Sequence, residues 1–562
     1  MVATYDLRAE GWIACPSLDG GRVEMLGLRG VLLQAHQLRG VHDSSPLVTV
    51  ALYRLLLAIL YRCWSASSDE EWDKLWLRLW AEQRFSATEI DAYLNGERCR
   101  NCFDLFSPDR PFYQTAELQV VKTEIKKKQQ VVIPMPDANL RLANEAPDSN
   151  GATLFDHRCY TSLQPWTSAQ AARCLVAAQS FGTCTSKTGQ ARIGDGEILE
   201  PPGRNDGLAL RGLTIWITGE TLFQTLLLNF APYETWDYVA MDVPAWEQKD
   251  GFAQVVSSWN QPQRPYGPAE RYTWQGRLIR LIPEQTSEGV VVRKLFYTQG
   301  RCVCKTNDAP DDFMKAYNRD EKVGWKALPL NAARAAWRDA HALLSVRSDV
   351  FKPPAVLRYV HTLVGENLLH CTTPFGFEAV GLASGGEAAK FLLWRHDRLS
   401  VPHTLLKDET LVGLLGVLLA DAEFVAAELA NKVMTIAKAF VPPHNNPAPK
   451  EVKHLADALD ARPAYWARLE NHFTTLLADL PEKGAVAVPD WRAKVEREAK
   501  QALQESCRQL GNTPQAIRAK ASVSFYFQAD KQTVLLERAE QDKQKKLKKR
   551  KGVKASERTS SS

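Results

Sequence analysis

The sequence predicts an α+β protein, in which a large mixed α/β domain with long loops precedes a C-terminal four-helix bundle. Three observations support this fold class. The chain has 562 residues, and a chain of this length is usually too long to fold around a single hydrophobic core. Strand-like and helix-like segments alternate before residue 400 without a βαβ repeat, and four apolar-periodic runs follow. We therefore expect the mixed domain over residues 1–400, the bundle over 401–530 and a basic, disordered tail over 531–562.

Two helices are expected early in the first domain. Ser45 and Pro46 precede an apolar run that ends near Trp64, an order typical of an N-cap followed by the first helical turn. Trp72, Trp76 and Trp80 follow at intervals of four residues, which places them on one helical face. A tryptophan stripe belongs more often to a core than to a binding site, so we expect this face to be buried.

Strands are expected later in the same domain. The segments 212–218 and 277–281 are rich in apolar and β-branched residues. The segment 119–134 is strand-like on both sides of the lysine triplet 126–128, and 168–180 has helical periodicity. This irregular order does not favour a doubly wound parallel sheet.

The C-terminal bundle is predicted from four runs with helical periodicity. They are Leu405–Phe440, Val452–Leu480, Trp491–Leu510 and Pro514–Ser524. Short breaks between them favour antiparallel neighbours, and Pro463 is expected to kink or split the second run.

Composition indicates a soluble protein. Hydrophobic residues make up 45% of the chain and charged residues 24%, which is ordinary for globular proteins. Met1–Glu10 carries charges and no apolar segment of the signal-peptide type. The richest apolar run, Leu411–Ala420, is interrupted by Asp421 before it reaches the ~18 residues of a membrane span. We therefore expect a cytoplasmic location.

The positive charge of the chain is concentrated in its tail. Residues 540–562 contain nine Lys/Arg and three Asp/Glu, a net charge of +6 against +5 for the whole chain. The remaining residues are therefore near neutral, and contacts with nucleic acid must come from local patches.

The cysteines offer a weak case for a metal site. Cys99 and Cys102 could form one half of a zinc site, with Cys302 and Cys304 as the other half. One residue separates the second pair, fewer than the two to four usual in zinc knuckles. We therefore prefer an interpretation without metal or any other cofactor.

The central segment 150–157 is the first candidate site. Leu154 and Phe155 would anchor a loop whose tip carries Asp156 and His157. An Asp–His hydrogen bond that only stabilises the loop is the structural alternative.

No catalytic motif supports an enzyme. The chain lacks His-Glu-x-x-His, Gly-x-Ser-x-Gly and a complete phosphate-binding loop. One alternative is a metal-assisted hydrolase that uses His157 and His396. Another is a general nucleic-acid-binding protein that acts through its basic tail.

Several stretches carry a family resemblance: Gly40–Val48, Phe103–Gln114, Ala152–His157, Gly219–Asn229, Leu278–Leu281, Met314–Trp325 and Phe391–Asp397. In this order along the chain they resemble the CasA family, the large subunit of the type I-E CRISPR Cascade complex. No single stretch is decisive, but together they extend over about 400 residues. The helical remainder fits the C-terminal four-helix bundle of that family.

The resemblance implies a non-catalytic DNA-recognition subunit. Such a subunit sits against the 5′ end of the guide RNA and the backbone, small and guide-end-binding subunits. It reads the protospacer-adjacent motif in double-stranded target DNA, helps to open the duplex, and docks the recruited helicase-nuclease. Base pairing reads the long sequence while protein reads the short motif.

The resemblance also implies particular residues. The family loop that contacts the motif matches the segment around Phe155, Asp156 and His157. Lys187 stands in a segment that is glycine-rich in the family, where its amine could contact phosphate. A lysine that reaches the minor groove corresponds to Lys305, with Lys315 as the competing candidate.

A wedge hairpin is the last implied element. It corresponds to Ser384, Gly385, Gly386, Glu387 and Ala388, and it would insert under the first base pair. The family usually has Gln or Asn where this chain has Ala388. Either Glu387 performs the steric work or the wedge is weaker.

Overall fold

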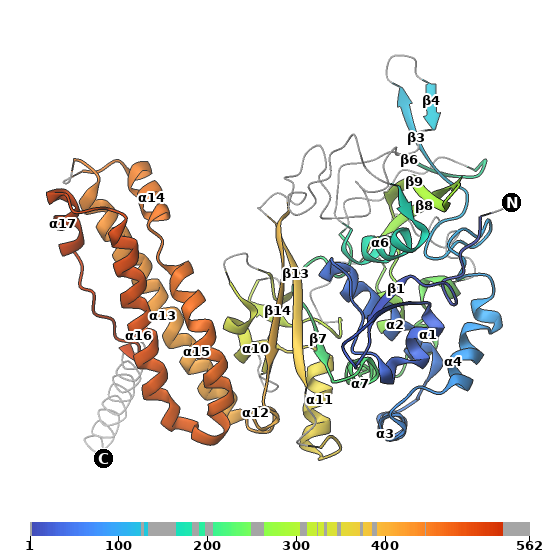
Figure 1. Ribbon diagram of the computed structural model, residues 1–562, viewed down its shortest axis with the longest axis horizontal. Coiled ribbons are helices and arrows are strands. Elements are labelled where there is room, and N and C mark those ends of the chain that lie inside the picture. The colour runs from blue at the N-terminus through green and yellow to red at the C-terminus, as the bar shows by residue number, and fades with distance from the viewer. Residues whose placement is uncertain are drawn as a thin grey trace, which may run out of the picture. The chain divides into compact units, whose positions relative to one another are not determined.

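The computed structural model describes residues 3–124, 129–132, 165–182, 190–196, 206–248, 263–303, 312–322, 324–330, 334–344, 350–370, 375–384, 391–443 and 446–531. The chain forms two compact units (Figure 1). The first comprises Met1–Ala336 and Ala342–Ser400, and the second comprises Trp337–His341 and Val401–Ser562.

The first unit is built around helix α2 (Pro46–Cys63), which packs against α6 (Ser168–Phe181) and α9 (Pro268–Tyr272). The Ser45 side chain accepts a hydrogen bond from Val48 N, so the predicted N-cap is confirmed. Nearly every side chain of α2 is buried. Around it lie α1 (Leu28–Leu33), α3 (Asp69–Glu82), α4 (Ala87–Leu94), α7 (Leu222–Leu228), α11 (Ala355–Gly365) and the hairpin of β1 (Ile13–Pro16) and β2 (Val23–Leu26).

The tryptophan stripe of α3 belongs to the core, as predicted. Trp72 and Trp76 are fully buried, and the ring of Trp80 stacks on that of Trp76 at 5.0 Å. Trp76 Nε1 donates to the carbonyl oxygen of Leu227, which ties α3 to α7.

Among the described residues, two helices have the length and composition to cross a membrane: α2 and α13 (Glu409–Phe440). The expectation that no apolar run is long enough was therefore wrong. In α2, 83% of the apolar window is buried inside the protein, and in α13 the share is 44%. The core helix of a folded protein meets the same criterion, and α2 contains an arginine that is paired inside the first unit.

Two three-stranded antiparallel sheets carry the loops of interest. One has the order β4-β3-β6, from Gln129–Val132, Leu118–Glu124 and Gln190–Ile193. The other has the order β5-β9-β8, from Trp166–Thr167, Gly289–Gln299 and Arg277–Thr286. The predicted strands on both sides of residues 126–128 are confirmed, as is the strand over 277–281.

Two further sheets complete the first unit. β7 (Thr214–Thr218) pairs with β13 (Gly376–Ser384), and β13 pairs with β14 (Phe391–Ser400). The second sheet has the order β11-β10-β12, from Gly324–Ala327, Tyr317–Asp320 and Phe351–Lys352.

The second unit is helical. Its three longest helices are α13, α15 (Arg462–Lys483) and α16 (Ala487–Arg508), which pack on one another. Shorter helices are α12 (His403–Lys407), α14 (Pro449–Ala458) and α17 (Pro514–Ala521). Pro463 stands in the first turn of α15, so the predicted second run is split into α14 and α15. The four-helix arrangement stays a prediction.

A short segment from the middle of the chain completes the core of the second unit. The Trp337 ring stacks on Phe473 at 4.6 Å. The Arg338 guanidinium lies 3.7 Å above the Trp466 ring and forms a bidentate ion pair with Glu423, with distances of 2.9 and 2.7 Å.

Candidate nucleic-acid interface

The ends of two predicted contact loops adjoin the same pair of sheets. The segment that contains Phe155, Asp156 and His157 leaves β4 and returns to β5. The segment that contains Lys187 leaves α6 and returns to β6. All four residues lie outside the described residues, so the structure shows where their loops are anchored and not where their side chains point.

One hydrophobic cluster joins the two sheets that border these segments. Leu118 and Val120 of β3, Ala191 of β6, Leu278 of β8 and Phe296 of β9 are buried together. Strands from both sheets therefore share a core. The cluster joins the sheet that contains β4 and β6 to the sheet that contains β5, and these strands border the two segments.

The ends of α6 are also held by specific hydrogen bonds. At its start, Thr167 and Gln170 form a reciprocal capping box. At its end, the carbonyl oxygen of Gly182 accepts from Arg277 Nη2 at 2.9 Å and from Gly207 N at 2.7 Å. Arg277 is buried and its Nε donates to Tyr297 Oη, so the start of the Lys187 loop is tied to β8 and β9.

Lys305 follows an anchored stretch of backbone. Gly300 N donates to Gly276 O, Arg301 N donates to Gln275 O, and Val303 forms a bridge with Gln263. Lys305 itself lies outside the described residues.

Lys315, the competing candidate, is not available for DNA. Its side chain is buried, and Nζ donates to the carbonyl oxygens of Leu208 and Arg211, each at 2.5 Å. A buried amine that is held by two carbonyls cannot reach a groove. The alternative that Lys315 reaches the minor groove was therefore wrong, and Lys305 remains the candidate for that lysine.

The wedge segment connects two long paired strands. β13 and β14 pair in antiparallel register from Gly376↔Ser400 to Ser384↔Phe391, with an irregularity at Ala383/Ser384. The backbone of Ser384 thus ends β13, while Gly385, Gly386, Glu387 and Ala388 lie outside the described residues. Six residues join the strands, and β7 supports β13 on its other edge.

His396 has a structural environment in this sheet. Its Nε2 lies 2.6 Å from Glu378 Oε2, and its ring stacks on Trp216 at 5.7 Å. Arg398 Nε lies 3.1 Å from Glu378 Oε1. The carboxylate of Glu378 therefore holds His396 and Arg398 across the β13–β14 pair.

The neighbouring Asp397 cannot act together with His396. Successive residues of a strand point to opposite faces. Asp397 accepts from Arg395 Nε at 2.7 Å and from Ala336 N at 2.6 Å. The sequence pair His396–Asp397 thus belongs to two separate structural networks, which weakens the hydrolase alternative.

The described residues contain no group of three metal-binding side chains. Cys99 and Cys102 are buried free thiols, and Cys102 Sγ lies 3.0 Å from the carbonyl oxygen of Cys99. Cys302 is half-buried and Cys304 lies outside the described residues. The zinc site stays an alternative without support from this geometry.

A buried ion pair between α2 and the segment that precedes β10 was not expected from the sequence. Arg54 of α2 donates to both carboxylate oxygens of Asp312, at 3.2 and 3.0 Å, and both side chains are buried. Burial raises the pKa of Asp312, but the charges of Arg54, Lys315 and Arg271 outweigh it and hold the pKa at about 2. The only signal in the sequence was an arginine within an apolar helix.

A second buried carboxylate organises the start of α9. Asp242 accepts hydrogen bonds from Ala269 N and Glu270 N, at 2.9 and 2.7 Å, and from Tyr233 Oη. Burial raises the pKa of Asp242, and these hydrogen bonds offset only part of that effect. Its role is to cap the helix.

Comparisons with known proteins agree on one family. The family model described as "CRISPR-associated protein Cse1" matches residues 6–509. The CRISPR-associated protein CasA/Cse1 of Thermus thermophilus is 30% identical over 526 residues, which cover 92% of this chain and 95% of that protein.

Solved structures are similar over nearly the whole chain. A structure of Thermus thermophilus CasA (Cse1) is 26% identical with a TM-score of 0.69, and covers 93% of this chain and 97% of its own. Thermobifida fusca Cse1 is 25% identical with a TM-score of 0.70, at 92% and 96% coverage. A chain of a CRISPR RNA-guided surveillance complex has the same fold, at 22% identity and a TM-score of 0.71, with 92% and 98% coverage.

Proposed function

The chain belongs to the Cse1 family, the CasA family of type I-E CRISPR systems, and from this we propose that it is the non-catalytic large subunit of a Cascade surveillance complex. In this role it recognises the protospacer-adjacent motif in double-stranded DNA. It then helps to start unwinding and R-loop formation. It also docks the helicase-nuclease that cuts the target.

The observation that carries this proposal is the common support of the contact loops. The segments that contain Phe155–His157 and Lys187 begin or end at strands of two sheets, and these two sheets share one hydrophobic cluster. Such support suits a surface that must recognise DNA through loops, because loops on a rigid base lose less conformational entropy on binding.

The chemistry of the loops fits motif reading in the minor groove. Lys187 and Lys305 would contact phosphate or groove edges, and Phe155 and His157 would contact the motif. Minor-groove edges of A·T and T·A are nearly equivalent, so we expect the protein to accept more than one motif.

The segment Ser384–Ala388 would act as the wedge. Inserting a group between base steps costs a few kcal/mol of unstacking, and the element that inserts needs firm support. The β13–β14 pair, held on its other edge by β7, provides a support of this kind.

The partners would be the guide RNA 5′ end, the other Cascade subunits, the target duplex and the helicase-nuclease. A surveillance-complex chain shares the fold of this chain, which supports the assignment to such a particle. We place the assembled particle in the cytoplasm, where guide RNA and invading DNA meet.

A reconstitution experiment tests the proposal. The purified chain is added to a guide-loaded particle that lacks its large subunit, and binding to matched DNA is measured with and without the adjacent motif. We expect binding to appear only when both the chain and the motif are present. Binding that does not depend on the motif would refute the proposal.

The same preparation tests for catalysis. We expect the chain alone to bind DNA weakly, to leave DNA uncut and to contain no stoichiometric metal. Metal-dependent cleavage by the chain alone would support the hydrolase alternative instead. Loss of all DNA binding on removal of Gln541–Ser562 would support the alternative of a binding protein that acts through its tail.

A further inference from the structure

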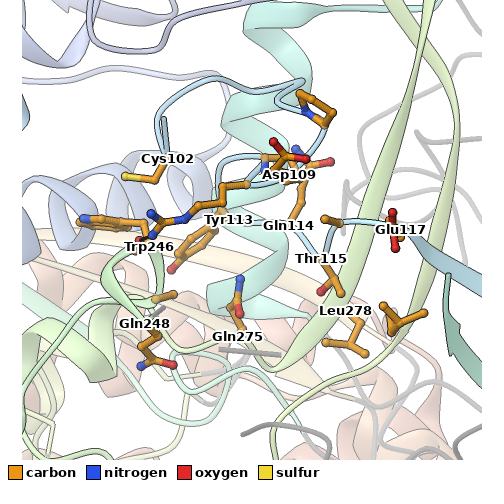
Figure 2. A pocket seen from close by; sticks show the side chains of 16 residues that line it. Cys102, Asp109, Tyr113, Gln114, Thr115, Glu117, Trp246, Gln248, Gln275 and Leu278 are labelled. Atoms are coloured by element: carbon orange, nitrogen blue, oxygen red, sulfur yellow. Dashed lines mark hydrogen bonds between the residues drawn. The ribbon is translucent and has the colours of Figure 1, made fainter. Parts of the chain in front are cut away.

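Described residues of the first unit line a cavity of ≈ 380 Å³ (Figure 2). It lies among the segments 108–117, 245–248 and 275–278. The wall includes Asp109, Thr115, Glu117, Trp246, Gln275 and Leu278. We refer to it as the Thr115 cavity.

The wall from Tyr113 to Glu117 is rigidly held. Thr115 N donates to Ile279 O at 2.9 Å, and Gln179 Nε2 donates to Tyr113 O at 3.3 Å. Tyr113 and Glu117 both adopt left-handed backbone conformations, with φ of 60° and 55°. Such conformations persist only where the surroundings enforce them.

The Gln114 side chain adds a second set of restraints. Its amide nitrogen donates to Leu105 O, and its amide oxygen accepts from Leu281 N, both at 2.7 Å. The wall is therefore formed before any ligand arrives, which is the condition for a preorganised site.

Two polar side chains of the cavity make no side-chain hydrogen bond to other described residues. Thr115 is only 5% exposed, and its hydroxyl makes no hydrogen bond in the described part of the chain. The side-chain amide of Gln275 makes none either within the same residues. Figure 2 shows both side chains among the residues that line the cavity. Because buried polar side chains are normally hydrogen-bonded, the Thr115 hydroxyl indicates a ligand, and the half-buried Gln275 amide offers a second polar contact.

Two acidic side chains at the cavity have no ion-pair partner among the described residues. Asp109 and Glu117 are exposed, and neither carboxylate has an ion-pair partner within the described residues. Arg110 is the basic residue of the lining, and its guanidinium donates to the carbonyl oxygens of Trp246 and Arg100, at 2.8 and 3.3 Å. These two carboxylates would repel phosphate groups and attract a cationic side chain.

We propose that the Thr115 cavity binds a short peptide segment of a neighbouring protein subunit and receives an arginine side chain from it. A free carboxamide such as Gln275 can donate to and accept from a peptide group. A guanidinium offers five donors in one plane, which suits the Glu117 carboxylate and the Thr115 hydroxyl together, whereas a lysine is a single point charge. A single side chain would leave much of a cavity of this size empty, so we infer a segment of a few residues.

This inference rests on the proposed function, because it takes the neighbour to be another subunit of the particle. A protein segment is favoured over nucleic acid by the two free carboxylates. A photo-crosslinking amino acid at Ala116, which lines the cavity, tests this choice in the assembled particle. We expect one crosslinked protein peptide that contains arginine. Crosslinks only to guide RNA or DNA would overturn the proposal.

Two variants test the recognising groups. Thr115→Val keeps the shape and removes the hydroxyl, and Glu117→Gln keeps the size and removes the charge. Glu288→Gln is the matched control, since Glu288 is an exposed carboxylate in the β8–β9 turn. We expect each test variant to raise the Kd of the chain for the particle about tenfold, and the control to change it less than about twofold.

The outcomes separate this inference from the function on which it rests. If the chain joins the particle and confers motif-dependent DNA binding while both variants bind as tightly as the unmodified chain, the arginine site is wrong and the function stands. If the chain never joins the particle, both are wrong. Unchanged circular dichroism and melting temperature must accompany the expected loss, since unfolding of a variant would overturn its assignment to the site.

Discussion

At the scale of single residues, the stability of the first unit depends on charged side chains that are buried together. Arg54 and Asp312 lie in the core, where removing one partner of such a pair leaves an uncompensated charge. Lys315 adds a third buried charge and donates to two carbonyl oxygens. These residues fix the start of the segment 312–317, which follows the predicted contact residue Lys305 in the sequence.

The Asp312 carboxylate should make stability sensitive to acid. Its pKa is depressed to about 2 in the folded protein, so its contribution is present above the unfolded pKa of roughly 4 and is lost as the pH falls towards 2. Asp312→Asn should be less stable at pH 5. The difference in unfolding free energy between the two proteins should narrow by about 2 kcal/mol between pH 5 and pH 2. Urea unfolding followed by circular dichroism measures the unfolding free energy of both proteins at each pH. A difference that stays constant with pH would contradict the depressed pKa of Asp312.

Two lysine variants should separate a structural role from a DNA-binding role. Lys315→Met leaves the carbonyl oxygens of Leu208 and Arg211 without their donor, so it should lower the melting temperature. Lys305→Ala should leave that temperature unchanged and weaken binding of motif-bearing DNA by about three- to tenfold, with a shallower dependence on salt. Binding titrations at three salt concentrations provide the measurement. If Lys315→Met weakened DNA binding and Lys305→Ala lowered the melting temperature instead, Lys315 would be the DNA-contacting lysine.

At the scale of elements, local signals in the sequence predicted helices and strands well. Ser45 caps α2 and Pro46 begins it, Trp72 and Trp76 are buried, and Pro463 stands in the first turn of α15. These features were predictable because caps, periodicity and proline act within a few residues. The pairing of β3 with both β4 and β6 was not predicted. Such pairings join distant segments, so no local pattern encodes them. The candidate contact residues came from the family resemblance, and the structure adds their anchors.

The β13–β14 hairpin should act in duplex opening rather than in motif engagement. Replacing Ser384–Ala388 by a short glycine linker keeps both strands and removes the groups that would insert between base pairs. We expect motif-dependent binding to persist while opening of the first base pairs is impaired. Permanganate footprinting of unpaired thymines in the bound target measures the opening. If the footprints were as strong as those of the unmodified chain, the hairpin would not act as the wedge.

At the scale of the whole molecule, the second unit is not continuous in sequence. Trp337–His341 belongs to it, although Val401 begins its main part. Helical periodicity marked 405–440 and the later runs, but it carries no information about which short segment completes their core. A boundary drawn from periodicity alone therefore omits residues that the helical unit needs.

Removing the Trp337 side chain tests how far the helical unit depends on this segment. Its ring stacks on Phe473 and lies edge-on to Trp466, so Trp337→Ala should cost about 3–5 kcal/mol of the unit's stability. Val486→Ala, at a position 78% exposed in the same unit, is the matched control. Hydrogen–deuterium exchange of the intact chain provides a local measurement. Exchange should accelerate in α13 and α15 and stay unchanged in β13 and β14, because the loss is confined to one unit. Equal acceleration in both units would mean that they unfold together, and the segment would then stabilise the whole chain.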